Sequence, residues 1–387
     1  MKQTVLIVHN YYQTPGGEDT VVANEKKLLE EHGHRVVLYT RHNSELNDHP
    51  LRKKLLLPFC TIFNPRTYRE IRNIIKTKKI DIVHVHNTLA LVSPAVYYAA
   101  RSCGVPVVQT VHNFRLLCPG ATFYRDDHIC EDCVRHGLSC AVRHGCYRGS
   151  KLQTLLCVLS TKLHRLTGIY SKIHYICLTE FNREKLLQGG FIKPEQIFVK
   201  PNFLDHPLPF VSGINRKAQF IFVGRLDLLK GIEVLFNAWR LLGKNAPPLL
   251  VCGTGPMDTW CQNFLKEHNL SSVTLKGFVA HSSVLEYIAE SQALIMPTQW
   301  YEGFPMSIVE SFSVGTPVIG SNIGNVKGLI DEGKNGWSFQ FDSPESLAAV
   351  VRKALDTPIV LDEDFRQNYT GNTNYNQIEK IYRECHL

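Results

Sequence analysis

The sequence predicts an α/β protein with two domains, each built on a doubly wound parallel sheet. Its 387 residues exceed the size of one ordinary hydrophobic core, so two domains are expected. Short apolar runs alternate with helical patterns along the chain, as in parallel sheets covered by helices on both faces. The alternation stops at residues 201–218, where prolines crowd a polar, linker-like stretch, and then restarts.

The first domain is expected to span residues 1–200. Residues 5–8 form a continuous apolar run, typical of a buried parallel strand, and a glycine-bearing loop follows at 15–18. An amphipathic helix at about 19–32 and a strand at 35–39 complete a βαβ unit. Further apolar runs predict strands at 81–85, 105–109 and 175–178.

The second domain is expected to span residues 201–372. Its predicted strands lie at 220–223, 249–252, 273–275, 293–296 and 317–319. A final helix, at about 373–387, is expected to pack back on the first domain. Two doubly wound domains would leave a cleft between the carboxyl ends of their strands, where ligands of such folds bind.

Composition and charge exclude several classes of protein. Hydrophobic residues make up 44% of the chain, as in globular proteins, and no apolar run reaches the roughly 18 residues of a membrane span. No signal peptide is recognisable, so a cytosolic location is expected. Residues 1–200 contain 28 Lys and Arg but 16 Asp and Glu. This excess fits either a solvated surface or attraction to anionic lipid or an anionic acceptor. Because no recognition motif accompanies it, nucleic acid is not an expected partner.

The most informative segment runs from residue 300 to residue 316. Pro305 suits the first position of a helix and Gly315 the residue after its end, which predicts a helix at 305–314. Glu302 then precedes the helix and Glu310 lies within it, while the amides at the helix start form an anion site. A sugar diphosphate would combine the anion with hydroxyl groups that the acids can accept. The alternative is two solvated glutamates favoured by the helix dipole.

A second loop, at residues 223–231, also follows a strand and opens a helix. Gly224 permits a tight turn, and Arg225 and Lys230 offer two cations, which a diphosphate leaving group needs. The alternative is a surface Arg and a surface Lys. A third loop, at 252–258, fails as a dinucleotide fingerprint because Asp258 stands where the third glycine belongs, which argues against a dehydrogenase.

Taken in order, these segments resemble the motifs of glycosyltransferase family 4. Residues 302–310 look like the family's signature of two glutamates separated by seven residues, and residues 224–231 look like its diphosphate loop. Further motifs follow in the family's order at 253–256, 276–278 and 333–336. The resemblance covers nearly the whole chain. It implies the GT-B fold, in which two Rossmann-like domains face a cleft, transfer with retention at the anomeric carbon, and no cofactor for catalysis.

The resemblance also implies roles for individual residues. Arg225 and Lys230 would hold the diphosphate, Glu302 would contact the hydroxyls of the donor sugar, and Glu310 would accept from the ribose. His112 resembles the family's histidine near the anomeric carbon. The implied catalytic residues are His112, Glu302, Arg225 and Lys230. The implied donor-binding residues are Gly16, Gly17, Gly224, Gly277, Phe278, Gly303, Phe304 and Glu310.

The function implied by the resemblance is transfer of a hexose from a nucleoside-diphosphate sugar to a glycan or a lipid-linked acceptor. The implied setting is bacterial surface polysaccharide synthesis, in the cytoplasm or on the inner face of the cell membrane with peripheral membrane contact. The alternative is a catalytically inactive sugar-nucleotide-binding protein, although Glu302, Arg225 and Lys230 are all present. Residues 325–328 depart from the family's glycine, apolar residue, Pro-Glu pattern, which leaves the donor sugar open.

Five of the twelve cysteines lie in a predicted insertion at residues 118–146. Cys130 and Cys133 have the spacing of metal ligands, and Cys118 and Cys146 would complete a tetrahedral thiolate site for structural zinc. The alternative is a set of reduced thiols without a metal. Because the insertion follows His112, it is expected to shape the acceptor side of the protein.

Residues 150–172 form a basic amphipathic helix directly after this insertion. Its leucines recur at helical spacing and its lysines and arginine lie between them. Such a helix either faces the core and keeps one side wet, or lies on a membrane surface and presents a lipid-linked acceptor.

Overall fold

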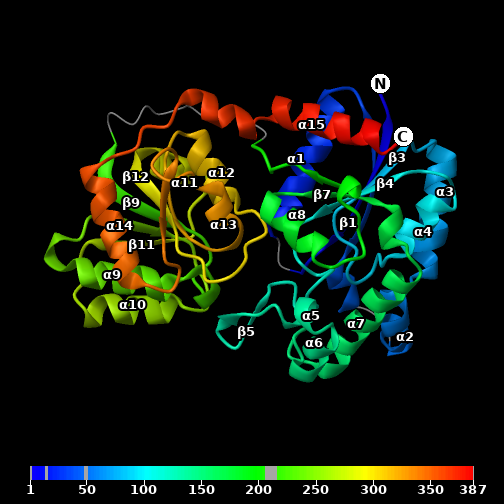
Figure 1. Ribbon diagram of the computed structural model, residues 1–387, viewed down its shortest axis with the longest axis horizontal. Coiled ribbons are helices and arrows are strands. Elements are labelled where there is room, and N and C mark those ends of the chain that lie inside the picture. Colours follow the sequence, from blue (N-terminus) through cyan, green and yellow to red (C-terminus); the bar gives the residue numbers. More distant parts are fainter. Residues whose placement is uncertain (1, 14–15, 48–50, 205–215, 387) are drawn as a thin grey trace. The chain divides into compact units, whose positions relative to one another are not determined.

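The computed structural model describes residues 2–13, 16–47, 51–204 and 216–386. The chain divides into two compact units (Figure 1). Unit 1 comprises Met1–Arg125, Cys130–Pro201 and Asn374–Leu387, and unit 2 comprises Asp126–Ile129 and Asn202–Thr373. Most of the predicted linker lies outside the described residues.

Unit 1 is built on a six-stranded sheet in the order β2-β1-β3-β4-β7-β8, and its paired strands are parallel. The strands are β1 (Thr4–Tyr11), β2 (Arg35–His42), β3 (Ile82–Val85), β4 (Val107–Val111), β7 (His174–Cys177) and β8 (Ile197–Val199). Val5 pairs with Val36 on one side and with Ile82 on the other. The central strands are rich in Val and Ile because helices bury both of their faces.

Two separate apolar cores hold these helices on the sheet of unit 1. On one face pack α3 (Pro65–Lys78) and α4 (Ala95–Arg101). On the other face pack α1 (Gly17–Glu31) and α15 (Gly371–Glu384), the last helix of the chain. The remaining long helices of unit 1 are α2 (Leu51–Ile62), α7 (Lys151–Leu166) and α8 (Glu180–Leu187).

The cysteine-bearing insertion lies between β4 and α7. It contains two short strands and two short helices, β5 (Tyr124–Arg125), β6 (His128–Ile129), α5 (Asp132–Arg135) and α6 (Ser139–His144). Ser150 starts α7, because its hydroxyl accepts the backbone N–H of Gln153.

Unit 2 repeats the architecture with a six-stranded sheet in the order β11-β10-β9-β12-β13-β14, again with parallel pairs. The strands are β9 (Lys217–Val223), β10 (Leu249–Cys252), β11 (Val273–Gly277), β12 (Ser291–Met296), β13 (Val318–Ser321) and β14 (Gly336–Phe339). The helices are α9 (Ile232–Leu242), α10 (Asp258–Glu267), α11 (His281–Glu290), α12 (Met306–Ser313), α13 (Gly324–Leu329) and α14 (Pro344–Asp356). The predicted fold class, two doubly wound parallel-sheet domains, is confirmed.

The strand order of unit 2 defines where a ligand belongs. The chain builds outward from β9 to β11 and then returns to place β12 on the other side of β9. Such a reversal is a topological switch point, and the loops after the two strands part there to leave a crevice at the carboxyl edge of the sheet. The loops after β9 and β12 are the two loops that the sequence singles out.

Candidate active site

Lys230 and Glu302 meet at the switch point of unit 2. Lys230 ends a short helical turn after β9, and this turn is capped by Asp227, whose Oδ1 accepts the backbone N–H of Lys230 at 2.9 Å. Glu302 lies in the loop between β12 and α12. The Lys230 Nζ donates to Glu302 Oε1 at 2.7 Å, so two residues that are 72 positions apart in the sequence form one ion pair.

Glu302 is buried and held by several hydrogen bonds. It is only 6% exposed. Besides Lys230, its Oε1 accepts from Thr298 Oγ1 at 3.1 Å and from the indole Nε1 of Trp300 at 2.8 Å. Three donors on one oxygen hold the carboxylate in a single orientation.

Arg225 lies in the same loop as Lys230 but has a different environment. Its Nε donates to Asp227, and its side chain is 64% exposed. The guanidinium is therefore fixed at one edge and open to solvent elsewhere, as a residue that binds an incoming phosphate would be.

Two glycines allow the loops of this edge to approach one another. Gly231 has φ +73°, and a Cβ there would lie 1.7 Å from the carbonyl oxygen of Pro297, at the end of β12. Gly253 has φ +143°, and its Cβ would lie 1.9 Å from the carbonyl oxygen of Gly224. A larger residue at position 231 would push the loop of Arg225 and Lys230 away from the loop after β12, and one at position 253 would push it away from the loop after β10.

Asn325 is a site residue that the sequence reasoning missed. It lies in the segment that departs from the family pattern, it is fully buried, and its Nδ2 donates to the backbone carbonyl oxygens of both Glu302 and Gly303. Asn325 thus supports the loop that carries Glu302. No sequence signal reveals this role, because the partners of Asn325 are backbone carbonyls.

The other predicted donor-binding residues of unit 2 differ from one another in burial. Glu310, on α12, is 9% exposed and its Oε1 accepts from His281 Nε2 at 2.9 Å, which raises the pKa of His281. Phe304 is buried, whereas Phe278 is 86% exposed and follows Gly277, which has φ +67°. An exposed aromatic ring at the carboxyl end of β11 is free to contact a base.

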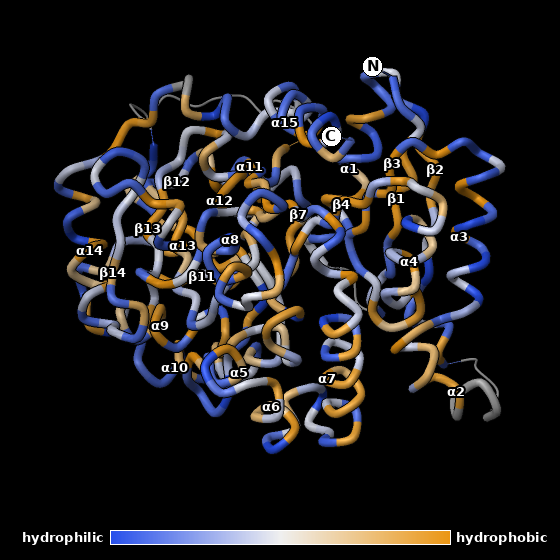
Figure 2. Tube along the Cα trace, turned by 45° about the vertical axis from the view of Figure 1, so that its right-hand side comes forward, coloured by the Kyte–Doolittle hydropathy of each residue, from blue (hydrophilic) through white to orange (hydrophobic). Residues whose placement is uncertain are grey.

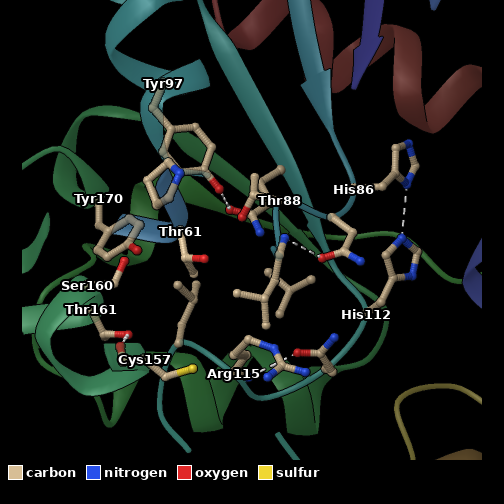
Figure 3. Close-up of a pocket in the computed structure, with 17 residues that line it drawn as sticks. Thr61, His86, Thr88, Tyr97, His112, Arg115, Cys157, Ser160, Thr161 and Tyr170 are labelled. Atoms are coloured by element: carbon tan, nitrogen blue, oxygen red, sulfur yellow. Dashed lines mark hydrogen bonds between the residues drawn. The ribbon is translucent and has the colours of Figure 1, made fainter. Parts of the chain in front are cut away.

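His112 lies in unit 1, directly after β4. Its Nε2 is 2.9 Å from His86 Nδ1, and both rings belong to the wall of a pocket (Figure 3). The wall also includes side chains from the end of α2 and from α7. Burial lowers the pKa of His112 to about 3, so its ring is neutral at physiological pH.

Gly16 and Gly17 form the start of α1 in the same unit. A Cβ at either position would meet none of the described residues within 4 Å. Asp19 fixes this start to β1, because its Oδ2 accepts the N–H of Gly16 at 2.9 Å and its Oδ1 lies 2.7 Å from His9 Nε2. The predicted catalytic and donor-binding residues therefore divide between the two units, with Gly16, Gly17 and His112 in unit 1 and the others in unit 2.

The four predicted zinc ligands lie in one neighbourhood. The Cβ of Cys146 and the Sγ of Cys118 both lie within 4 Å of the position that a Cβ on Gly120 would take. Burial and the nearby thiols raise the pKa of Cys133 to about 12. Among the described residues, however, no three of the sulfur atoms of Cys118, Cys130, Cys133 and Cys146 lie within 4.8 Å of one another. The zinc site stays a prediction.

Two family models match the chain and together span residues 15–372. Residues 15–207 match the model described as Glycosyltransferase Family 4, and residues 207–372 match the model described as Glycosyl transferases group 1. The chain belongs to glycosyltransferase family 4. The resemblance inferred from the sequence is thereby confirmed.

Relatives of this family 4 chain include proteins with known activities. It is 30% identical to a glycogen synthase of Mycobacterium tuberculosis over 176 residues, which are 44% of this chain and 42% of the relative. The match therefore spans less than half of that protein. It is 24% identical to the alpha-D-kanosaminyltransferase of Streptomyces kanamyceticus, over 75% of this chain and 74% of the relative.

Solved structures show the fold of the family 4 chain. The Anabaena protein HepE, crystallised in complex with UDP, superposes with a TM-score of 0.66 at 17% identity, over 98% of this chain and 99% of HepE. The fold is therefore GT-B.

Proposed function

We propose that the protein is a retaining glycosyltransferase that moves a hexose from a nucleoside-diphosphate sugar to a glycan or lipid-linked acceptor. The observation that carries the proposal is the Lys230–Glu302 pair at the switch point of a family 4 chain. A cation for the diphosphate and a buried acid for the sugar hydroxyls lie side by side there. Solved structures of HepE with UDP and with UDP-glucose support a sugar nucleotide as the donor.

The proposed reaction needs no external base. The bond between the anomeric carbon and the diphosphate oxygen breaks while the acceptor oxygen bonds to the same carbon from the same face. The leaving diphosphate takes the proton of the acceptor hydroxyl. Lys230 and Arg225 neutralise the negative charge that develops on the diphosphate, and Glu302 orients the sugar by accepting from its hydroxyls.

An inactive sugar-nucleotide-binding protein is the second candidate. It would retain the donor pocket but would lack a residue that stabilises the leaving group. Because Lys230, Arg225 and Glu302 are all present and two of them are already paired, an enzyme is favoured. Synthesis of a bacterial surface polysaccharide is the proposed setting.

Donor binding provides the direct test. A thermal-shift screen with UDP-, GDP- and ADP-sugars should raise the melting temperature with one nucleotide class, because a ligand at 100 times its Kd stabilises a protein by about 2.7 kcal/mol. Slow release of the nucleoside diphosphate in the same samples would identify an enzyme. A shift without any release, with or without candidate acceptors, would favour the inactive binding protein, and no shift with any donor would contradict both.

The exposed side of α7 supports a membrane-bound acceptor. Its buried side consists of Thr154, Cys157, Val158, Ser160 and His164. Five of its six leucines instead face solvent, with exposures of 69% for Leu152, 38% for Leu155, 46% for Leu159, 45% for Leu163 and 85% for Leu166, while Leu156 is half-buried. Figure 2 shows hydrophobic residues along this helix. The leucine stripe is therefore not the core-facing side of the helix.

The charge around this stripe suits an anionic bilayer. α7 contains no acidic residue, and Lys151 and Lys162 are exposed on it. Helix α2 packs beside α7 and adds Phe59, which is 70% exposed, and Leu56, which is 57% exposed. No helix within the described residues is long and apolar enough to cross a membrane. We propose that this surface rests on the inner leaflet and brings a lipid-linked acceptor to the pocket beside His112.

Vesicle binding tests the membrane surface. The chain should co-sediment with vesicles of phosphatidylcholine and phosphatidylglycerol, and less with phosphatidylcholine alone, because cationic residues are attracted to anionic lipid. Changing Leu159 and Leu166 together to Ser should lower binding to the anionic vesicles roughly tenfold, since two leucines lose their burial in the bilayer. Leu241→Ser, on α9 with 43% exposure, is the matched control and should bind like the wild type. Equal binding by all three proteins would contradict the proposal.

Zinc is proposed only as a structural ion of the insertion. The chemistry of the donor set is suitable, since Cys118, Cys130, Cys133 and Cys146 are soft ligands in a four-thiol arrangement. The spacing of their sulfur atoms does not yet form a closed site, so binding would have to draw the thiols together. Zinc would then stabilise the insertion and take no part in the transfer.

A further inference from the structure

Three side chains of unit 1 form a buried chain that leads to His112. Glu25 comes from α1, His86 follows β3 and His112 follows β4. Glu25 is fully buried and His86 is 3% exposed. The distance from Glu25 Oε2 to His86 Nε2 is 3.3 Å, and that from His86 Nδ1 to His112 Nε2 is 2.9 Å.

Hydrogen bonding to the other carboxylate oxygen of Glu25, Oε1, fixes the orientation of this side chain. Lys200 Nζ donates to Glu25 Oε1 at 2.6 Å and to Asn374 Oδ1 at 3.0 Å. His84 lies next to this group but takes no part in the chain, since its Nδ1 is 2.8 Å from the hydroxyl of Tyr382 and its Nε2 is 2.8 Å from that of Thr110. Glu25 Oε2 is therefore left to face His86.

The carboxylate determines where His86 carries its proton. Within the described part of the chain, neither Glu25 Oε2 nor His86 Nε2 has a hydrogen-bond partner, and both atoms are buried. At 3.3 Å a bare nitrogen lone pair facing the carboxylate would be repelled, whereas the positive end of an N–H there is attracted to it. Burial keeps the pKa of His86 well below its usual value, so the ring holds one proton and that proton belongs on Nε2.

The position of the proton on His86 determines the tautomer of His112. With its proton on Nε2, His86 has a lone pair on Nδ1 and can only accept there. His112 must then donate from Nε2, which leaves its own Nδ1 without a proton. This Nδ1 is not among the buried atoms that lack a partner, and no hydrogen bond joins it to the described residues, so on this half-buried residue it is open as an acceptor.

We propose that Glu25 and His86 are positioning residues that hold His112 in the Nε2–H tautomer, so that its Nδ1 accepts a hydrogen bond from a hydroxyl of the sugar substrate. The role of Nδ1 toward a sugar rests on the proposed function. The tautomer itself does not, because it follows from the contacts of unit 1 alone. A proton on Nδ1 instead would replace this acceptor by a donor.

The tautomer of His112 can be determined in the absence of substrate. Nitrogen-15 NMR of protein labelled at histidine distinguishes a protonated ring nitrogen from a bare one, and loss of a resonance in His112→Gln assigns the signal. The wild type should show a bare Nδ1 and a protonated Nε2 at His112. A protonated Nδ1 in the wild type would overturn the proposal.

Two variants of His86 separate positioning from packing. His86→Gln keeps an acceptor for His112 and a donor for Glu25, so the tautomer of His112 should persist. His86→Leu removes both and should populate the Nδ1–H tautomer. His164→Leu is the matched control, because His164 is 1% exposed and hydrogen-bonded to Ile62 and Tyr98, and its loss should leave His112 unchanged. An unchanged His112 spectrum in folded His86→Leu, or Nδ1 protonation in His86→Gln, would contradict the positioning role.

Kinetics connect the tautomer with the sugar. With a working donor, kcat/KM should fall about 10- to 100-fold in His86→Leu and stay within about fivefold of the wild type in His86→Gln. Equal rates in the two variants would refute the role of Nδ1 toward substrate. If the wild type turns over no donor, the proposed function fails while the NMR result still decides the tautomer. If His86→Leu does not fold, the wild-type spectrum and His86→Gln remain decisive.

Discussion

Replacing Lys230 with alanine should lower kcat/KM about 100- to 1,000-fold, the cost of removing one preorganised donor from a developing negative charge. The ammonium is already held beside Glu302 at 2.7 Å, so it needs no reorganisation when the diphosphate leaves. The fold should survive, because Thr298 and Trp300 continue to donate to Glu302. Steady-state kinetics with the donor found by thermal shift would measure the loss.

Two further measurements isolate the leaving-group role. Lys353→Ala is the matched control within unit 2, because Lys353 pairs with Glu332 at 3.0 Å on the surface and exposed pairs contribute about 0–1 kcal/mol. It should keep wild-type kinetics. Calorimetric titration with the free nucleoside diphosphate should show weaker binding to Lys230→Ala than to the control. Near-normal turnover in Lys230→Ala would refute charge stabilisation by Lys230.

Most of the fold could be predicted because parallel strands buried on both faces leave a clear sequence signal. The runs at residues 5–8 and 293–296 lie within β1 and β12, each of which pairs with a strand on both sides. The terminal strands β8 and β14 were missed. β8 is apolar but has only three residues, and the four residues of β14 include Gly336 and Ser338, so neither shows the longer apolar run of a central strand.

The candidate site could be predicted where its functional residues belong to short sequence motifs. Glu302 and Lys230 each lie in a loop between a strand and a helix, and the switch point of the fold brings the two loops together. Asn325 could not be predicted, because its partners are backbone carbonyls that no side-chain pattern reveals. Glu25 and Lys200 were also missed, since they lie 175 residues apart and each looks like an ordinary surface charge.

Replacing Lys200 with methionine should lower the free energy of unfolding of unit 1 by about 3–5 kcal/mol, the usual cost of leaving one partner of a buried ion pair alone. Both side chains are fully buried, and Lys200 Nζ lies 2.6 Å from Glu25 Oε1. Burial tends to raise the pKa of Glu25, but Lys200 and His84 outweigh it and hold that pKa below its usual value. Urea denaturation followed by circular dichroism would measure the loss.

The pH dependence of the stability loss in Lys200→Met tests whether the unpaired Glu25 carboxylate causes it. In the wild type, a lowered pKa means that the contribution of Glu25 is present above the ordinary carboxyl range and is lost as pH falls through the folded value. In Lys200→Met, the pKa of Glu25 should rise, so the difference from the wild type should be largest near neutral pH and shrink toward about pH 4.

A double variant separates the charge from the packing of Lys200. Adding Glu25→Gln to Lys200→Met removes the unpaired charge and should recover much of the lost stability, because a buried pair can be replaced by neutral side chains at small cost. Lys193→Met is the surface control, since Lys193 lies 3.8 Å from Glu195 with both side chains exposed, and it should change the free energy of unfolding by less than about 1 kcal/mol. If the double variant were no more stable than Lys200→Met at neutral pH, shape and not charge would explain the loss. The recovery expected here would show that unit 1 retains a buried lysine to keep Glu25 ionised beside His86.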